Sequence, residues 1–211
     1  MKFCFSPFYF FSVYNKKKGQ EEIVVKGNCF LVLGPSGAGK TVIVNSVTTN
    51  RAVTTTTREP RFSEREGVDY YFVNKEEFEN MIKNDKLAEW AEYGKEGKKN
   101  YYGLTKDEFN KRLSLGDLFI VCTVEGVIHY KQVYPEAITL FVHSSFEDIQ
   151  KQLYDRGGNQ QDINHRISLY NEEMKSLELA DFVIQNKYNH LEESIAALRS
   201  IIKTNKKEVR N

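Results

Sequence analysis

The sequence predicts an α/β fold in which a parallel sheet is flanked by helices. Three observations predict it: short apolar runs of strand length, helical segments that alternate with them, and a glycine-rich turn between the first run and the first helix. The runs are almost continuously apolar, as expected for parallel strands that are buried on both faces. The expected strands are 29–33, 118–122, 137–142 and 182–184.

Helical periodicity follows these runs. The first helix is expected to open at 42–44, directly after the glycine-rich turn, and the chain is expected to close with an amphipathic helix at 191–202. Residues 156–161 are polar and contain glycine, which favours a mobile loop. The other expected helices are 106–113, 146–154 and 162–179.

Residues 51–106 differ from the alternating segments around them. A strand is expected at 69–73 and a helix at 75–85, and the remainder is rich in aromatic residues such as Trp90. We interpret this stretch as a small mixed α/β insertion. The whole chain of 211 residues is expected to form one domain with such insertions.

The charge balance limits the kind of partner. The chain has 30 basic and 29 acidic residues, a formal net charge of +1, so it lacks the overall basic field that collects nucleic acid or anionic membrane. No nucleic-acid or membrane partner is therefore expected, and any anion site must be local. The sequence leaves the oligomeric state open.

The three cysteines, Cys4, Cys29 and Cys122, are widely spaced. They form no Cys-x-x-Cys pair, and no histidine cluster accompanies them, so neither a disulfide framework nor a zinc site is expected. This usage favours a reducing compartment, and we expect a cytoplasmic protein.

Residues 1–27 form an extension of unknown role. An aromatic run at 3–14 precedes three lysines, and it is shorter than the about 20 apolar residues that cross a bilayer as a helix. An extra strand or packed arm, with a short strand at 23–26, is one interpretation. A disordered or wrongly assigned start and a targeting segment are the alternatives.

The glycine-rich turn carries the first chemical signal. Gly34–Thr41 fits G-x-x-x-x-G-K-[ST] and lies between an apolar strand and a helix, as a P-loop requires. Its backbone N–H groups would cradle a phosphate, the lysine would bridge the β- and γ-phosphates, and Thr41 would hold magnesium. GTPases, ATPases and small-molecule kinases all remain open. The expected triphosphate-binding residues are Gly34, Ser36, Gly37, Ala38, Gly39, Lys40 and Thr41.

A basic loop follows one helix later. Arg58 and Arg61 stand three residues apart with Pro60 between them, a spacing that lets two arginines clamp one dianion. A solvated basic loop is the alternative.

With the motifs that follow, the chain resembles the guanylate kinase family from about Asn28 to Ile202. The motifs and their order are the P-loop, T-T-R-x-P-R at 56–61, G-x-D-Y-x-F-V at 67–73, E-W-A at 89–91 and N-Y-Y-G at 100–103. The resemblance implies a P-loop NTPase core, a lid and an inserted subdomain that binds GMP, with ATP as donor and Mg2+ as cofactor.

The resemblance also implies residue roles. Arg58 and Arg61 would grip the GMP phosphate, which the Tyr70 and Tyr102 hydroxyls would also reach. Glu89 would accept hydrogen bonds from guanine N1 and N2, and adenine offers no such pair of donors. A surface glutamate and two tyrosines that only pack their rings are the alternatives.

Lid arginines complete the expected catalytic set. Arg156 and Arg166 match the family's lid positions and would neutralise the transferring phosphoryl group, whereas Gln152 replaces an earlier lid arginine. No histidine is assigned a role, because the acceptor is already a phosphate. The expected catalytic residues are Lys40, Arg58, Arg156 and Arg166. The expected boundaries are a core at 28–53 and 106–205, a monophosphate-binding subdomain at 54–105, a lid at about 156–168 and a tail at 206–211.

The sequence departs from the family pattern on the base and metal side. Val121 and Thr123 stand where the family has two acidic residues, and Leu104 replaces a Ser or Thr that touches guanine. Glu125 would compensate if the strand continued, because it would share a face with Thr123. We therefore expect ATP-dependent phosphorylation of GMP or dGMP. A kinase for another monophosphate or a sugar phosphate and a non-catalytic binding module are the alternatives.

Overall fold

The structure is a computed structural model that describes residues 27–62, 64–95, 98–155 and 160–206. The chain divides into two compact units, which are considered separately. One contains Ala52–Gly116, and the other contains Lys26–Arg51 and Asp117–Asn211. The aromatic run and the short strand expected at 23–26 lie outside the described residues.

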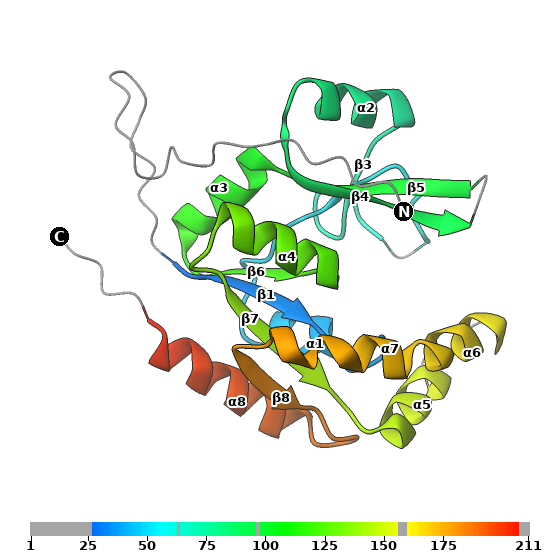
Figure 1. Ribbon diagram of the computed structural model, residues 1–211, viewed down its shortest axis with the longest axis vertical. Helices are drawn as coiled ribbons and strands as arrows, with labels where there is room; N and C mark the ends of the chain where they lie inside the picture. The colour runs from blue at the N-terminus through cyan, green and yellow to red at the C-terminus, as the bar shows by residue number, and fades with distance from the viewer. Residues whose placement is uncertain (1–26, 63, 96–97, 156–159, 207–211) are drawn as a thin grey trace. The chain divides into compact units, whose positions relative to one another are not determined.

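The unit that contains the P-loop is built on a parallel sheet in the order β6-β1-β7-β8 (Figure 1). Every neighbouring pair is parallel, as the sequence predicts. The register places Phe30 of β1 opposite Phe119 of β6 and Ile138 of β7. The strands are β1 (Cys29–Leu33), β6 (Leu118–Val121), β7 (Ile138–His143) and β8 (Phe182–Gln185).

Helices flank this sheet (Figure 1). Two predictions were incomplete. Helix α4 was not identified from the sequence, and the helix expected at 162–179 is three shorter pieces. The Ser168 hydroxyl bonds back to the His165 carbonyl near the first break, a contact that competes with helical hydrogen bonding. The helices are α1 (Lys40–Asn45), α4 (Val124–Val133), α5 (Phe146–Asp155), α6 (Gln160–Ser168), α7 (Tyr170–Met174), a 3-10 helix (Lys175–Leu179) and α8 (Leu191–Thr204).

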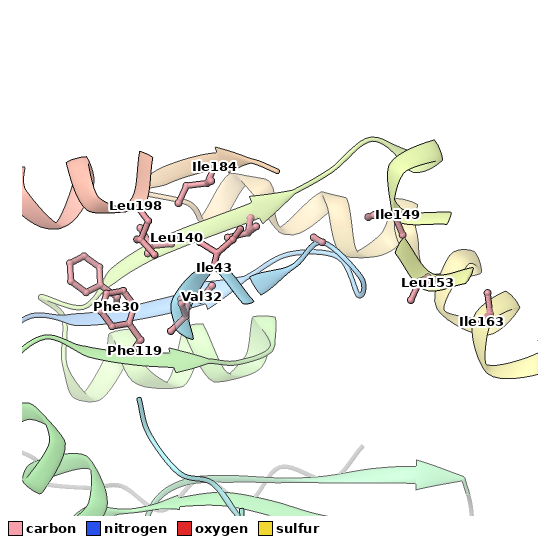
Figure 2. Packing of buried hydrophobic residues seen from close by; sticks show 13 residues of the cluster. Phe30, Val32, Ile43, Phe119, Leu140, Ile149, Leu153, Ile163, Ile184 and Leu198 are labelled. Atoms are coloured by element: carbon pink, nitrogen blue, oxygen red, sulfur yellow. The ribbon is translucent and has the colours of Figure 1, made fainter. Parts of the chain in front are cut away.

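The core of this unit explains the continuous apolar strands. Phe30 and Val32 of β1 belong to a buried cluster that also takes in α1 and α8, and the ring of Phe30 stacks on Phe119 at a centroid distance of 4.7 Å (Figure 2). Leu31 and Leu33 point to the opposite face of the strand and are also buried. Both faces of β1 are therefore covered, as the parallel arrangement requires.

The other unit contains a second sheet, in the order β3-β2-β5-β4, with α2 and α3. The small mixed α/β insertion is therefore confirmed, but the long β4–β5 hairpin was not identified. The ring of Tyr101 on β5 stacks on Phe78 of α2 at 5.1 Å and meets Trp90 of β4 edge-on at 5.6 Å. The elements are β2 (Thr55–Thr56), β3 (Tyr71–Phe72), α2 (Lys75–Lys83), β4 (Leu87–Lys95), β5 (Lys98–Thr105) and α3 (Lys106–Leu115).

Local signals fix α2 and α3. Asn74 begins α2 with a capping box: its side chain accepts from the Glu77 N–H at 2.8 Å, and the Glu77 carboxylate accepts from the Asn74 N–H at 2.9 Å. Thr105 caps α3 by accepting from the Glu108 N–H. By its contacts α3 lies in the unit with Ala52–Gly116, although it was expected to belong to the core.

Candidate functional site

The P-loop joins β1 to α1, and its conformation depends on glycine at defined positions. Gly34 has φ of 133°, and a Cβ there would lie 2.0 Å from the Val142 carbonyl oxygen. Gly39, the residue before α1, has φ of 86° in the left-handed region. Glycine is therefore needed at Gly34 because another strand lies close to it, and at Gly39 because its backbone is left-handed.

Lys40 lies over its own loop. Its ammonium group donates to the Gly34 carbonyl at 2.6 Å and to the Pro35 carbonyl at 2.9 Å. The neighbouring Thr41 is exposed in the first turn of α1, so its hydroxyl is accessible to a ligand. The loop therefore presents a cation, a hydroxyl and the start of a helix together.

Two side chains from beyond the loop contact Ser36. The Ser36 N–H donates to the Glu173 carboxylate of α7 at 2.9 Å, and Arg166 of α6 donates to the Ser36 hydroxyl at 3.1 Å. Arg166 therefore reaches the P-loop, whereas Arg156 lies outside the described residues. Sequence reasoning missed Glu173, because no local pattern connects positions 137 residues apart.

Arg58 is held firmly in the other unit. Its guanidinium donates to both oxygens of Glu64, at 2.8 and 2.9 Å, and to the Glu59 carbonyl at 2.6 Å. It also lies over the rings of Tyr70 and Phe72, with its central carbon 5.2 and 5.9 Å from their centroids. The side chains of Arg58 and Glu64 are only 16% and 14% exposed. Arg58 is thus a preformed, oriented cation.

The pKa values of this pair follow from its contacts. Burial disfavours the charged guanidinium of Arg58, but hydrogen bonds to Glu64 and Tyr102 outweigh it and raise the pKa of Arg58. Burial likewise opposes ionisation of Glu64, but the Arg61 N–H, which donates to it at 2.8 Å, and the Arg58 guanidinium lower the pKa of Glu64. Both groups are therefore charged at neutral pH.

The remaining acceptor-side residues lie in the same unit as Arg58. The rings of Tyr70 and Tyr102 meet edge-on at 6.2 Å, and Tyr102 hydrogen-bonds Arg58. The side chain of Arg61 is exposed. Glu89 is half-buried on β4. The structure thus groups Arg58, Tyr70 and Tyr102.

The departures from the family pattern have clear structural positions. Val121 is the last residue of β6 and is 42% exposed. Thr123 caps α4 by accepting from the Gly126 N–H at 3.3 Å. The strand alternation considered for Glu125 is therefore wrong, because the helix begins at Val124 and Glu125 lies exposed in its first turn.

Leu104 is 1% exposed and pairs with Glu89 across the β4–β5 hairpin. Its side chain is a core residue of its unit. This position therefore offers no hydroxyl to a ligand, in contrast to the family pattern.

Magnesium in P-loop sites is held mainly by phosphates and water with few protein ligands. Within the described ranges, no group of three or more His, Cys, Asp or Glu side chains is placed to hold a metal. The exposed Thr41 hydroxyl beside Lys40 fits the limited protein contribution that such a site needs.

In the described part of the chain, no helix is long and apolar enough to cross a membrane.

Comparisons with known proteins agree with this geometry. The guanylate kinase family model matches residues 26–205. A guanylate kinase of Bacillus anthracis is 35% identical over 170 residues, 76% of this chain and 81% of that protein. A guanylate kinase of Fusobacterium nucleatum is 36% identical over 184 residues, 83% of this chain and 96% of that protein.

Among solved structures, a guanylate kinase from Anaplasma phagocytophilum matches with a TM-score of 0.68 at 23% identity. The match covers 88% of this chain and 89% of the Anaplasma chain, and at that identity it supports the fold. The family model over 26–205 and the relatives above 30% identity show that the chain belongs to the guanylate kinase family.

Proposed function

We propose that this protein transfers the γ-phosphoryl group of ATP to the phosphate of GMP, giving ADP and GDP. The observation that carries the proposal is an intact P-loop, with Lys40 and Thr41 in place, in a member of the guanylate kinase family. The protein would share this activity with the curated relatives named guanylate kinase. dGMP fits the same chemistry.

The P-loop binds the donor. Backbone N–H groups of the P-loop and the start of α1 surround the β-phosphate, and Lys40 exchanges its carbonyl contacts for the β- and γ-phosphates. This exchange is favourable because phosphate oxygens carry more negative charge than the two carbonyl groups that the Lys40 ammonium leaves. Thr41 would be the protein ligand of magnesium, which would neutralise phosphate charge when bound with ATP.

The acceptor phosphate binds to the Arg58 group. Arg58 and Arg61 supply positive charge, and the hydroxyls of Tyr70 and Tyr102 donate hydrogen bonds. Glu64 keeps Arg58 in one orientation before the nucleotide arrives, which reduces the entropy cost of binding.

Glu89 recognises the base. Its carboxylate accepts hydrogen bonds only, so it matches the N1–H and N2–H donors of guanine. Adenine presents an acceptor at N1 and no amino group at C2, so the half-buried carboxylate would be left without these donors. A site built to hydrogen-bond a group rejects an analogue that lacks it more strongly than an apolar pocket does.

The transfer needs no general base. An oxygen of the GMP phosphate forms the new bond to the γ-phosphorus, the bond from that phosphorus to the bridging oxygen breaks, and ADP leaves with the electron pair. Arg166, which already reaches Ser36, and Arg156 neutralise the charge that the transferring group carries. Closure of the lid at 156–168 excludes water, which would otherwise compete as acceptor.

The test is to measure ADP release from purified protein with ATP and magnesium, offering GMP, dGMP, AMP, CMP and UMP in turn. We expect turnover with GMP and dGMP that Lys40→Ala abolishes. Turnover with a different acceptor would contradict the role of Glu89, and the absence of turnover with every nucleotide, in a folded protein that binds ATP, would favour a binding module.

A second candidate is a kinase for another monophosphate or a sugar phosphate. Leu104 is the observation that favours it, because a buried leucine occupies the position where the family pattern has a hydroxyl for guanine.

Cys29 and Cys122 carry thiols and not disulfides, which fits a reducing, cytoplasmic compartment for either enzyme.

A further inference from the structure

Asn186 lies directly behind the P-loop. It follows β8 and is buried, and its side-chain amide donates to the Ala38 carbonyl at 2.9 Å. Ala38 is a P-loop residue, and 148 positions separate the two in sequence. The contact therefore ties the end of the last strand to the loop that opens the first helix.

This hydrogen bond fixes one peptide plane of the loop. In a trans peptide the C=O and the following N–H point in opposite directions. When Asn186 draws the Ala38 carbonyl toward itself, the N–H of Gly39 is directed away from Asn186. The N–H groups of this segment are the donors that a P-loop offers to phosphate, so Asn186 sets the aim of one of them.

Gly39 and Asn186 also fit together sterically. A Cβ on Gly39 would lie 2.5 Å from the amide nitrogen of Asn186, closer than any side chain tolerates. The glycine that the motif requires thus creates the space that the asparagine amide occupies. The left-handed φ of 86° at Gly39 gives a second reason for glycine at the same position.

A small polar network holds the amide in this orientation. The Ser194 hydroxyl of α8 donates to the side-chain oxygen of Asn186 at 3.0 Å. The backbone N–H of Asn186 donates to the His143 carbonyl at 2.7 Å, and its carbonyl accepts from the Ser144 hydroxyl. A flipped amide would place its oxygen against the Ala38 carbonyl, so only the observed orientation satisfies these groups.

We propose that Asn186, oriented by Ser194, is a positioning residue that holds the P-loop in its phosphate-binding conformation. Asn186 acts through Ala38 and need not touch the nucleotide. The inference rests on ATP as the phosphoryl donor, as proposed above, but it makes no use of the acceptor. Its signature is weaker ATP binding with unchanged acceptor binding.

The experiment compares the dissociation constant of Mg-ATP, measured by titration calorimetry on the full chain, for the wild type, Asn186→Asp and Ser194→Ala. Asn186→Asp keeps the acceptor for Ser194 but removes the donor to Ala38, and we expect about tenfold weaker ATP binding, equivalent to about 1.4 kcal/mol. Ser194→Ala leaves that donor in place and loosens only its orientation, so we expect a smaller loss, about threefold.

Asn28→Asp is the matched control. Asn28 is also a buried asparagine of this unit, and its amide donates to the Asn205 carbonyl at 2.6 Å. It lies in a chain segment that precedes β1, so its loss should lower the melting temperature and leave ATP binding at the wild-type level. This control separates the general cost of a buried carboxylate from an effect at the P-loop, and Ser194→Ala, which adds no charge, separates the loss of positioning from repulsion between a carboxylate and the phosphates of ATP.

Folded Asn186→Asp protein that binds ATP as tightly as the wild type would overturn the proposal. If that variant does not fold, Ser194→Ala provides the test. A dissociation constant for Mg-ATP equal to that of the wild type in Ser194→Ala would then contradict the role of the network. A wild type that binds ATP but does not phosphorylate GMP would refute the proposed function alone, because the binding series needs no acceptor.

Discussion

The two groups that we propose bind phosphate are built in different ways. The P-loop offers its backbone, so its essential residues are glycines and one lysine at fixed spacing. The group around Arg58 offers side chains that ion pairing and ring stacking hold in place. A backbone site specifies little about the ligand beyond phosphate, whereas a side-chain site can change its preference by single substitutions.

A carboxylate nevertheless supports each group. Glu173 accepts from the Ser36 N–H in the P-loop, and Glu64 accepts from Arg58 and from the Arg61 N–H. Glu64 holds the Arg58 side chain in one orientation, whereas Glu173 occupies a backbone donor of the P-loop for which a bound phosphate would compete.

The largest effect is expected from Lys40→Ala. Removing the ammonium leaves the β- and γ-phosphates without their main cation, so kcat/KM should fall about 10³-fold or more. Initial rates of ADP formation measure the loss. Lys111→Ala, an exposed lysine of α3, is the control, and equal rates for the two variants would contradict the P-loop assignment.

The next effect is expected from Gly34→Ala. A methyl group there would lie 2.0 Å from the Val142 carbonyl oxygen, so the strand and loop must separate, at about 3 kcal/mol of unfolding free energy or more. Gly116→Ala is a matched control: its φ of 140° is close to the 133° of Gly34, and a Cβ added there would meet no heavy atom of the described residues within 4 Å. Chemical denaturation that gives equal losses would refute the close-approach argument.

A smaller effect is expected from Arg58→Lys. Lysine keeps the charge but loses the paired bonds to Glu64 and the stacking on Tyr70, so the KM for GMP should rise about tenfold to a hundredfold, and the KM for ATP should change little. Steady-state kinetics with each substrate varied will separate the two. Arg112→Lys, at the Arg112–Glu108 pair of the same unit, serves as control. A rise in the KM for ATP alone would show that Arg58 acts on ATP and would contradict its assignment to GMP.

The smallest effect is expected from Glu64→Gln, and it depends on pH. The pKa of Glu64 is lowered below its usual 4.5 in the folded protein, so its stabilisation is present above pH 4.5 and is lost as the pH falls through the folded pKa. We therefore expect the melting temperatures of wild type and variant, measured from about pH 7 down to about pH 3, to differ at neutral pH and to converge at the acid end. Parallel curves would show that the Arg58–Glu64 pair does not contribute as described.

The contrast between the P-loop and the group around Arg58 also explains what could be predicted from the sequence. The P-loop is one continuous segment, so its motif predicted the turn, and the apolar run before it and the helical pattern after it predicted β1 and α1. The grouping of Arg58, Tyr70 and Tyr102 came from motif order. The supporting residues Glu173 and Asn186 could not be found, because their contacts join positions 137 and 148 residues apart and no local pattern records them.

Missed elements have local reasons. The strands of the β4–β5 hairpin lack a continuous apolar run, and their aromatic residues pack locally: Tyr101 stacks on Phe78 of α2 and meets Trp90 of β4. Only two residues, Cys122 and the capping Thr123, separate the end of β6 from the start of α4, and the mixed composition of α4 gave no clear sign of the change from strand to helix. The expectation for Glu125 failed for this reason.

The most direct test of the central claim is to identify the product that receives the phosphoryl group. Wild-type protein with ATP, magnesium and GMP, followed by ³¹P NMR, should yield GDP and ADP in equal amounts, and the Lys40→Ala variant should yield neither above background. ADP with inorganic phosphate and no GDP would identify an ATPase, and that result would contradict the account of a phosphoryl transfer between two nucleotides.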